Sequence, residues 1–511
     1  MNIQEAKDEI IHTVRIYTRK NDKGQYLIPT VHQRPILLIG PPGIGKTAIM
    51  RQAAEACGVG LVAYTITHHT RQSAVGLPVV KTRTYAGREV SVTEYTMSEI
   101  VASVYECIEQ TGNPEGILFI DEINCVSETL TPTMLQFLQN KTFGTHRVPE
   151  GWIIVAAGNP PEYNKSARMF DVVTLDRVKS INIEVDFPVW KSYASQTGMH
   201  SAIISYLSSK TQNFYYIEES RGDRDFVTAR GWDDLSVLLK AYEEEEIPVT
   251  LPVIREYIHS DRIASDFAAY YRMFTGYKKE YTPQKVLQGT IEREAEVHQE
   301  QLLAQALPDE QYSILQMFLS ELHRLFRVYE EAGNLQKRRK EVFIQIKSLA
   351  DRQKELSAET MLIRFLEQFD TALKIKDEHQ IISEAERKRE EAVSRFYSDC
   401  MYELKGRRVQ DIGIALKDLE EKLQAADEKQ EKEAQNLTAM VDRALLFLEE
   451  SVGEGEMMGY FMTSLSQNPS AARFLGANAC DRFLKHLDLM AAVDEEEELK
   501  RQIEEYRKQS E

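Results

Sequence analysis

The chain has 511 residues, of which 42% are hydrophobic and 28% are charged. This length predicts two to four domains, and the composition is that of a soluble globular protein that also carries long exposed helices. The formal net charge of -18 at pH 7 argues against a dedicated nucleic-acid binder, because affinity for phosphate comes from clustered Lys and Arg side chains.

The cysteines and the N-terminal residues favour a cytoplasmic protein. The five cysteines are scattered without CxxC spacing, so neither a disulfide framework nor a zinc site is indicated. The N-terminus is charged and has no apolar core of signal-peptide length. Since no apolar run has the roughly 18 residues of a membrane span, we expect a soluble protein in a reducing cytoplasm.

Residues 1–188 alternate between predicted helices and strands. An amphipathic helix over Ile3 to Thr18 comes first, and a second helix follows the Gly-rich turn after residue 39. The strands are short, apolar on both faces and bounded by turn residues, at 35–39, 61–67, 116–120 and 151–157. This pattern predicts an α/β fold with a parallel sheet covered on both sides. Residues 79–96 alternate around Ala86-Gly87 and predict an inserted β-hairpin.

The rest of the chain reads as mostly helical. Residues 189–285 predict mostly helices, with one hairpin between Asn213 and Val227. Residues 286–511 are rich in Glu, Lys, Gln and Leu, with no proline from 309 to 468, which is typical of long helices. The apolar residues from Ile412 to Leu423 follow one helix face, but heptads are not sustained over four repeats. We therefore expect an all-α C-terminal region that is a bundle or hairpin rather than an extended coiled coil.

The string GPPGIGKT matches a phosphate-binding loop between a strand and a helix. Its glycines let backbone N–H groups surround phosphate oxygens, Lys46 reaches the β- and γ-phosphates, and the Thr47 hydroxyl can bind magnesium. The alternative, a plain Gly-rich turn, is disfavoured by the flanking strand and helix. The predicted nucleotide-binding residues are Gly40, Pro41, Pro42, Gly43, Ile44, Gly45, Lys46, Thr47 and Ala48.

Two further strands end in polar residues that suit phosphoryl transfer. The strand GILFI is followed by Asp121 and Glu122, so the first carboxylate can hold magnesium and the second can orient the attacking water. The strand GWIIVAA leads to Asn159, whose amide can help to place that water. Taken alone, the acidic pair has the less favoured alternative of a solvated acidic turn, whereas composition by itself would favour an Asn-Pro turn at Asn159. The phosphate-binding loop upstream and the spacing of the strands favour the functional interpretation.

These motifs resemble those of the AAA+ ATPases, and among them the MoxR-like group. GPPGIGKT resembles their Walker A motif, ILFIDEIN their Walker B motif and AAGNPPEYN their sensor 1 region. The resemblance covers about residues 30–285. Within it, the hairpin at 79–96 resembles the helix-2 insert of this group, and residues 140–151 resemble its hairpin before sensor 1. Two residues depart from the family pattern, Cys125 in place of a basic residue and Val178 in place of Phe.

The resemblance also implies roles for three arginines. Arg177 would act as an arginine finger in the nucleotide site of a neighbouring subunit, with Arg168, on the same predicted helix, as the weaker alternative. Arg230, in the first turn of a helix capped by Thr228, would be the sensor 2 residue of the lid; the alternative is that its stem only packs beside Trp232.

The main functional hypothesis is a ring-forming ATPase, which the resemblance implies is a hexamer, that hydrolyses ATP to ADP and phosphate with Mg²⁺ and remodels a protein partner. The resemblance suggests a partner with a von Willebrand factor A domain, and the helical C-terminal region would be the adaptor. One alternative is a nucleotide-gated assembly scaffold with little turnover. The other, a DNA-directed NTPase, is disfavoured by the acidity of the chain and by the missing NKxD guanine reader.

Overall fold

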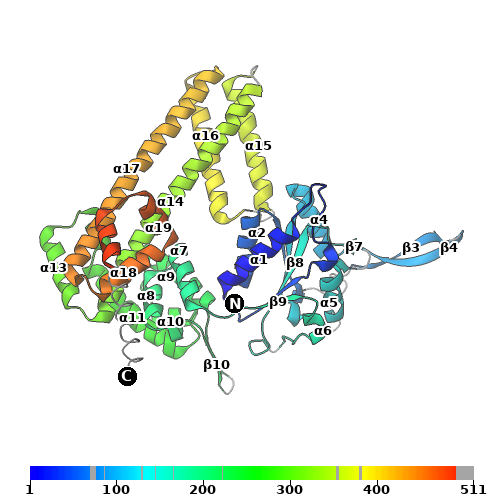
Figure 1. Cartoon of the computed structure of the whole chain (residues 1–511), viewed down its shortest axis with the longest axis horizontal. Coiled ribbons are helices and arrows are strands. Elements are labelled where there is room, and N and C mark those ends of the chain that lie inside the picture. Colours follow the sequence, from blue (N-terminus) through cyan, green and yellow to red (C-terminus); the bar gives the residue numbers. More distant parts are fainter. Residues whose placement is uncertain are drawn as a thin grey trace, which may run out of the picture. The chain divides into compact units, whose positions relative to one another are not determined.

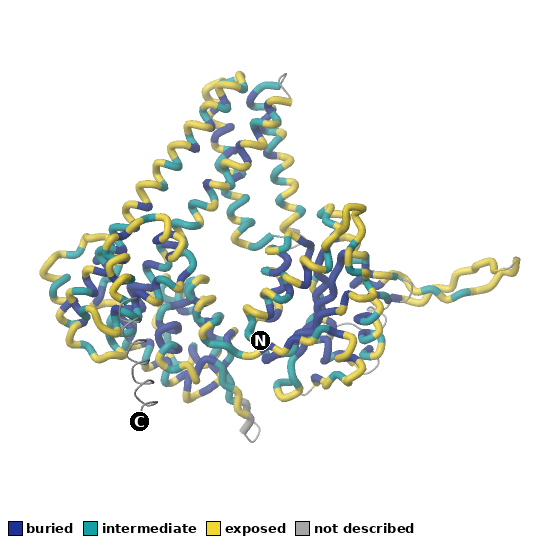
Figure 2. Tube along the Cα trace, viewed as in Figure 1, coloured by how far each residue is buried: buried dark blue, intermediate teal, exposed yellow. Residues whose placement is uncertain are grey.

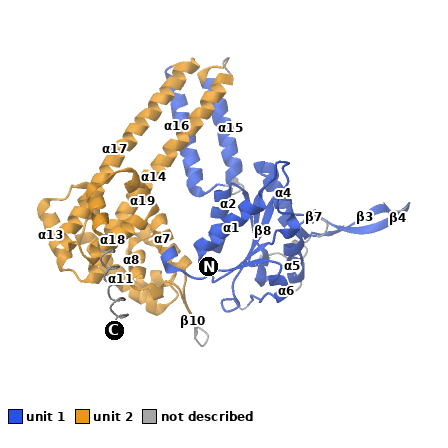
Figure 3. Cartoon of the chain, viewed as in Figure 1, with its two compact units in different colours: residues 1–189, 359–407 blue, residues 190–358, 408–511 orange. Residues whose placement is uncertain are grey.

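The computed structural model describes residues 1–68, 76–85, 87–127, 130–143, 146–164, 166–220, 223–352, 356–378 and 382–490. The chain divides into two compact units (Figures 1 and 3). Unit 1 comprises residues 1–189 and 359–407, and unit 2 comprises residues 190–358 and 408–511. Within the described residues, no helix is long and apolar enough to cross a membrane.

Unit 1 contains a five-stranded parallel sheet of order β2-β5-β8-β1-β9. Its strands are β1 (Ile36–Ile39), β2 (Gly60–Thr65), β5 (Gly116–Asp121), β8 (Trp152–Gly158) and β9 (Lys179–Asn182). The four strands predicted from apolar runs are therefore confirmed. Their nearly continuous burial reflects helices on both faces, as expected for a parallel sheet.

Alternate residues of the central strands supply two separate cores. One core contains Leu37, Leu118 and Ile154, and the other contains their neighbours on the opposite face of the sheet. The first core is covered by α4 (Glu99–Thr111) and α5 (Thr131–Asn140). The second is covered by α1 (Ile3–Tyr17) and α2 (Lys46–Cys57), the two helices predicted in this region.

The predicted hairpin is an antiparallel pair of β3 (Pro78–Tyr85) and β4 (Arg88–Tyr95) that extends away from the rest of unit 1 (Figure 1). The first half of its turn, residue 86, lies outside the described residues. Almost every position of the two strands is exposed (Figure 2). A shorter hairpin precedes β8 and pairs β6 (Thr142–Phe143) with β7 (His146–Arg147).

Unit 1 also includes two helices from the distant part of the chain. They are α15 (Ala358–Glu378) and α16 (Glu384–Gly406), which run antiparallel. Lys405 pairs with Glu359 at 2.7 Å, and the Ser394 hydroxyl donates to the Asp370 carboxylate at 2.7 Å. The remaining short elements of unit 1 are η1 (Thr30–His32), η2 (Ile66–His68), η3 (Ile123–Cys125) and α6 (Val172–Leu175).

Unit 2 is almost entirely helical. Its one described hairpin pairs β10 (Tyr216–Ser220) with β11 (Asp223–Val227), as predicted, and its tip lies outside the described residues. The helices are α7 (Phe187–Thr197), which begins at the boundary between the units, α8 (Ser201–Ser209), η4 (Thr211–Asn213), α9 (Ala229–Glu244), α10 (Leu251–Arg255), α11 (Asp261–Glu280), α12 (Pro283–Gln288), α13 (Arg293–Gln305), α14 (Pro308–Arg352), α17 (Ile412–Val452), α18 (Glu456–Gln467) and α19 (Pro469–Ala477).

The two longest helices, α14 and α17, pack against each other in antiparallel directions. The buried Gln336 amide of α14 donates to the Leu423 carbonyl at 2.8 Å and to the Asp427 carboxylate at 3.1 Å. Lys340 pairs with Asp427, and about two helical turns further along Lys347 pairs with Glu420. At their other ends α14 and α17 join α18 and α19 in one apolar core. The C-terminal region is therefore a helical hairpin that merges into a bundle.

Candidate nucleotide-binding site

The loop after β1 has the backbone geometry that a phosphate-binding loop requires. Gly43 and Gly45 have φ angles of 73° and 96°, in the left-handed region that glycine adopts without strain. A Cβ atom on Gly40 would approach the Ile183 carbonyl oxygen at 2.9 Å. Gly43 and Gly45 are therefore needed for their backbone conformation, and Gly40 is needed because a side chain has no space there. The loop leads directly into α2, so the free backbone N–H groups of the first turn of α2 lie beside it.

Lys46 lies at the first position of α2, with only 8% of its surface exposed. Its ammonium group donates to the carbonyls of Gly40 at 2.8 Å and Pro41 at 2.7 Å, and to the Asn159 side-chain oxygen at 2.8 Å. The structure thus brings together the loop, its lysine and the residue after β8. Of the other predicted loop residues, Pro42, Gly43 and Ile44 are half-buried, while Gly45, Thr47 and Ala48 are exposed.

Thr47 and Asp121 meet at the same edge of the sheet. The Thr47 hydroxyl donates to the Asp121 carboxylate at 2.9 Å, although the two residues are far apart in sequence. Parallel strands β1 and β5 direct their carboxyl ends to one edge, which explains this contact. A hydroxyl and a carboxylate are oxygen ligands of the kind that Mg²⁺ prefers, so these side chains fit the predicted magnesium site.

Glu122 adopts an unusual backbone conformation directly after β5. Its φ angle is 57°, and its N–H donates to the Asp121 carboxylate at 2.9 Å. Its own carboxylate accepts a hydrogen bond of 2.9 Å from the hydroxyl of Thr67, which follows β2. Non-glycine residues with positive φ are uncommon and cluster at functional sites. Sequence reasoning missed Thr67, because only the adjacent positions of β2 and β5 in the sheet bring it to Glu122.

Cys125 occupies the position after the DEIN motif. It is half-buried, and the Asn164 amide approaches its sulfur at 3.2 Å. Burial, together with the charges of Glu122 and Asp121, raises the pKa of the thiol. Cys125 is therefore a neutral thiol at physiological pH, and it supplies no positive charge where the family pattern has a basic residue.

The segment around Arg177 differs in one respect from the sequence prediction. Arg177 does lie between a helix and a strand, because α6 ends at Leu175 and β9 begins at Lys179. Arg168 was expected on the same helix, but this was wrong. It lies in the loop before α6, whose single turn starts at Val172 after the N-cap Asp171. The Asp171 side chain accepts from the Thr174 N–H and so starts the helix only there.

Both arginines are exposed at an apolar surface. The Arg177 guanidinium donates a hydrogen bond to the side chain of Gln139 near the end of α5. Four of the large apolar side chains between the two arginines are exposed, namely Met169 at 85%, Val172 at 81%, Val173 at 57% and Leu175 at 39%, whereas Phe170 is half-buried. We call residues 168–177 the arginine patch. Exposed apolar side chains that lie together are often found where proteins contact other molecules.

Arg230 belongs to unit 2 and lies in the first turn of α9, as predicted. The Thr228 side chain accepts from the Gly231 N–H at 3.3 Å, which confirms the predicted cap. Trp232 is fully buried, and its indole N–H donates to the Phe214 carbonyl at 3.1 Å. The Arg230 side chain is exposed, so it remains accessible on the surface of unit 2.

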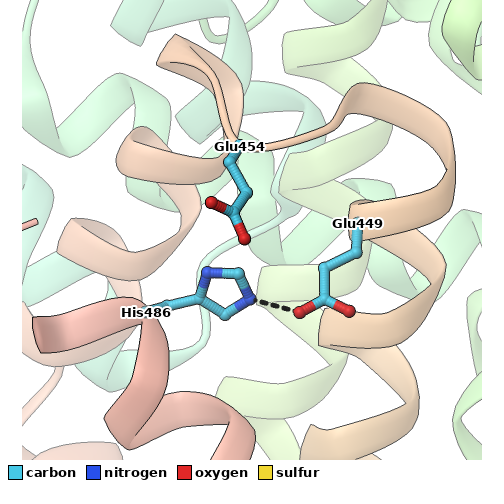
Figure 4. Close-up of side chains that lie close together, drawn as sticks. All are labelled: Glu449, Glu454 and His486. Carbon is cyan, nitrogen blue, oxygen red and sulfur yellow. Dashed lines mark hydrogen bonds and ion pairs between the residues drawn. The ribbon is translucent and has the colours of Figure 1, made fainter. Parts of the chain in front are cut away.

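A separate cluster in unit 2 has side chains that could bind a metal. Among the described residues, Glu449, Glu454 and His486 are the one such group, with ligand atoms within 4.8 Å of one another (Figure 4). Glu449 accepts from His486 at 2.7 Å and also pairs with Arg482, and Glu454 pairs with Lys485 at 3.5 Å. Because both carboxylates already face cations of the helical segment 481–490, the cluster serves to attach this segment to α17.

Comparison with known proteins agrees with this geometry. Residues 35–177 match the model of the AAA domain, dynein-related subfamily. These residues form an AAA+ domain. The match includes Lys46, Thr47, Asp121, Glu122 and Asn159, and it ends at Arg177. The sheet, its covering helices and the long helical C-terminal region are those of the predicted α/β AAA+ fold, which is therefore confirmed.

Solved structures give a more distant likeness. The structure of C. elegans PCH-2 matches with 15% sequence identity and a TM-score of 0.24. The match covers 43% of this chain and 50% of that chain, so this protein spans about half the length of PCH-2. No curated protein sequence matches this chain.

Proposed function

We propose that this protein is a MoxR-like AAA+ ATPase that hydrolyses ATP in a ring, which we take to be a hexamer, and uses the energy to remodel a protein partner. The observation that carries the proposal is the convergence of Lys46, Thr47, Asp121 and Asn159 at one edge of the sheet, where one hydrogen bond joins Lys46 to Asn159 and another joins Thr47 to Asp121, with Glu122 adjacent. This convergence occurs within the AAA+ domain, and AAA domains belong to nucleotide-hydrolysing ATPases.

Each of these residues has a role that its position supports. The loop amides and the Lys46 ammonium bind the phosphates of ATP, and Thr47 with Asp121 would hold the magnesium ion. A bound magnesium ion supplies positive charge to the β- and γ-phosphates. Glu122, held by Thr67, orients the attacking water and accepts its proton. Asn159 follows β8, which lies between β1 and β5 in the sheet, and its side chain contacts Lys46, so its amide can help to place the γ-phosphate and the water.

The arginine patch supports a site shared between two copies of the chain. Arg177 and Arg168 are both exposed beside apolar side chains, so a second copy that buries this patch would bring a guanidinium to its own nucleotide. A guanidinium stabilises the charge that develops on the transferred phosphoryl group and is worth a factor of about 10³–10⁵ in rate. We assign this role to Arg177.

We further propose a division of labour along the chain. Residues 1–188 bind and hydrolyse ATP, and residues 189–285 act as a lid that presents Arg230 to the γ-phosphate of the same subunit. The helices of residues 286–511 act as the adaptor for the partner. The resemblance to MoxR-like proteins supports a partner that contains a von Willebrand factor A domain and a cytoplasmic location.

Mixing two inactive variants tests the shared site. We expect Lys46→Ala and Arg177→Ala proteins to be nearly inactive alone. In an equal mixture of freely exchanging subunits, about a quarter of the interfaces would join an intact loop to an intact finger, so about a quarter of the wild-type activity should return. Subunit exchange is verified by co-purification of differently tagged variants, and Arg168→Ala is the matched control.

Four outcomes would change the proposal. If the mixture of Lys46→Ala and Arg177→Ala regains no activity although exchange occurs, and Arg168→Ala is active by itself, the shared-site model is wrong. If Arg168→Ala is inactive by itself but regains activity when mixed with Lys46→Ala, and the mixture with Arg177→Ala does not, Arg168 is the finger. If the assembled wild-type protein binds ATP but shows negligible turnover, the protein is a nucleotide-gated scaffold, and stimulation of turnover by DNA but not by protein would indicate a DNA-directed motor.

A further inference from the structure

We propose that Asn124 is a positioning residue that connects the catalytic end of β8 to the arginine patch. Asn124 belongs to η3, directly after the two acidic residues of β5, and no role follows for it from the motifs alone. The inference deepens the proposed ATPase function and rests on it, since it concerns how one nucleotide site communicates with the surface that faces the next subunit.

Asn124 is buried, with 5% of its surface exposed, and it makes contacts in two directions. Its side-chain amide donates to the Asn159 carbonyl at 2.7 Å and, over a longer distance of 3.4 Å, to the Arg168 carbonyl. Its own carbonyl accepts from the Arg168 N–H at 2.9 Å. One residue therefore fixes the backbone of Asn159 and both backbone polar groups of Arg168.

The residue before Asn159 gives independent evidence that this contact is built into the fold. A Cβ atom on Gly158 would lie 2.5 Å from the Asn124 side-chain oxygen and 2.8 Å from the carbon of its amide group. Atoms at such distances cannot coexist without displacement. Gly158 has an ordinary strand conformation, so glycine is needed here for the space that the Asn124 amide occupies.

These contacts form a continuous path from the phosphate-binding lysine to the surface. The Lys46 ammonium contacts the Asn159 side chain at 2.8 Å, the Asn159 carbonyl contacts Asn124, and Asn124 contacts the Arg168 backbone. Arg168 begins the arginine patch, and the next residue, Met169, is 85% exposed. A shift of Asn159 against the γ-phosphate would therefore move the start of the patch. Removing the Asn124 side chain would uncouple Asn159 from the arginine patch without removing any group that touches ATP.

A purely structural role for Asn124 would lower stability and leave turnover unchanged, so the test measures both. We expect Asn124→Ala to lower kcat about 10- to 100-fold, as lost buried hydrogen bonds misplace the catalytic groups, with the KM for ATP changed less than about threefold. The matched control is Asn468→Ala in unit 2, because Asn468 is also 5% exposed and its side chain caps α19. This control should lower the melting temperature similarly and leave kcat unchanged.

A second variant keeps the test decisive if Asn124→Ala folds poorly. Gly158→Ala retains Asn124 but displaces its amide, so it should lower kcat by a similar factor. In the Asn124→Ala background the added methyl group has room, so Gly158→Ala should cause little further loss, and the two effects should be far from additive.

The outcomes separate this inference from the proposed function. If the wild-type protein hydrolyses ATP and kcat is unchanged in both Asn124→Ala and Gly158→Ala, this inference is wrong but the proposed ATPase function stands. Additive losses in the double variant would also overturn it, because they would show that Gly158 does not act through Asn124. No turnover by the assembled wild-type protein would overturn the proposed ATPase function and this inference with it.

Discussion

Replacing Thr67 by Val tests whether the Thr67 hydroxyl orients the water-activating carboxylate. Thr67 donates to the Glu122 carboxylate at 2.9 Å, and this is a hydrogen bond to a charged group. Such bonds contribute about 1.5–3 kcal/mol, and because Thr67 is exposed and Glu122 half-buried we take the lower end of that range. A loss of about 1.4 kcal/mol in the transition state lowers the rate about tenfold. We therefore expect kcat to fall about tenfold in Thr67→Val.

The expected effect is specific to the chemical step. Thr67 donates to Glu122 and not to a residue of the phosphate-binding loop. The Kd and KM for ATP should therefore change less than about twofold. Steady-state ATPase assays give kcat and KM, and equilibrium titration with a fluorescent ATP analogue gives the Kd. Thr67→Ser keeps the hydroxyl and should retain most of the activity.

Two results would refute this reasoning. The first is an unchanged kcat in Thr67→Val. The second is a tenfold further loss when Thr67→Val is added to Glu122→Gln, because a hydroxyl that acts only through the Glu122 carboxylate has little left to orient once the negative charge is gone.

Three further predictions concern hydrolysis, pH and packing. Glu122→Gln should lower kcat by about 10²–10⁴ through loss of the general base, with ATP affinity within a few-fold of wild type in the same titration. Burial of His323 lowers its pKa to about 4, so between pH 6.5 and pH 4 the unfolded state binds more protons and the free energy of unfolding falls as the pH falls. From pH 7.5 to pH 5 this lowers the free energy of unfolding by about 2 kcal/mol. In urea titrations over this range, the free energy of unfolding of His323→Phe should fall by about 2 kcal/mol less than that of the wild type, and an equal fall in both proteins would contradict the prediction. A Cβ on Gly116 would lie 2.5 Å from the Trp152 ring, so Gly116→Ala should destabilise the protein by about 1–3 kcal/mol, whereas Gly276→Ala, with nothing within 4 Å, should be neutral or stabilising in the same thermal melts.

Local sequence patterns determined the sheet and the identity of most of the proposed site. The phosphate-binding loop is a continuous string in which Gly43 and Gly45 have φ angles that only glycine adopts easily, so sequence alone locates it. The strands could be predicted because a parallel sheet buried on both faces needs short apolar runs between turn residues. Asp121 and Asn159 could then be placed at one edge, since parallel strands end on the same side.

Contacts between distant segments could not be predicted in this way. Thr67 reaches Glu122 only because β2 lies next to β5, and Asn124 reaches Asn159 only because β5 lies next to β8. No residue type or spacing signals either hydrogen bond, since Thr and Asn also occur as ordinary turn residues. Gly158 carried the one detectable signal, a glycine at the end of an otherwise apolar strand, but its meaning requires knowledge of what its Cβ would meet.

In the segment before β9 and in the C-terminal helices, too, the sequence predicted local features and the tertiary structure decided the contacts. Charge and spacing placed Arg177 before a strand, but the N-cap Asp171 restricts α6 to one turn, and this left Arg168 in a loop. Composition determined that the described part of residues 286–511 is mostly helical. Only the tertiary structure decided their partners, with α14 paired to α17 and with α15 and α16 included in unit 1. Helix propensity is a property of each segment alone, whereas the choice of partner depends on which buried side chains fit together across the whole fold.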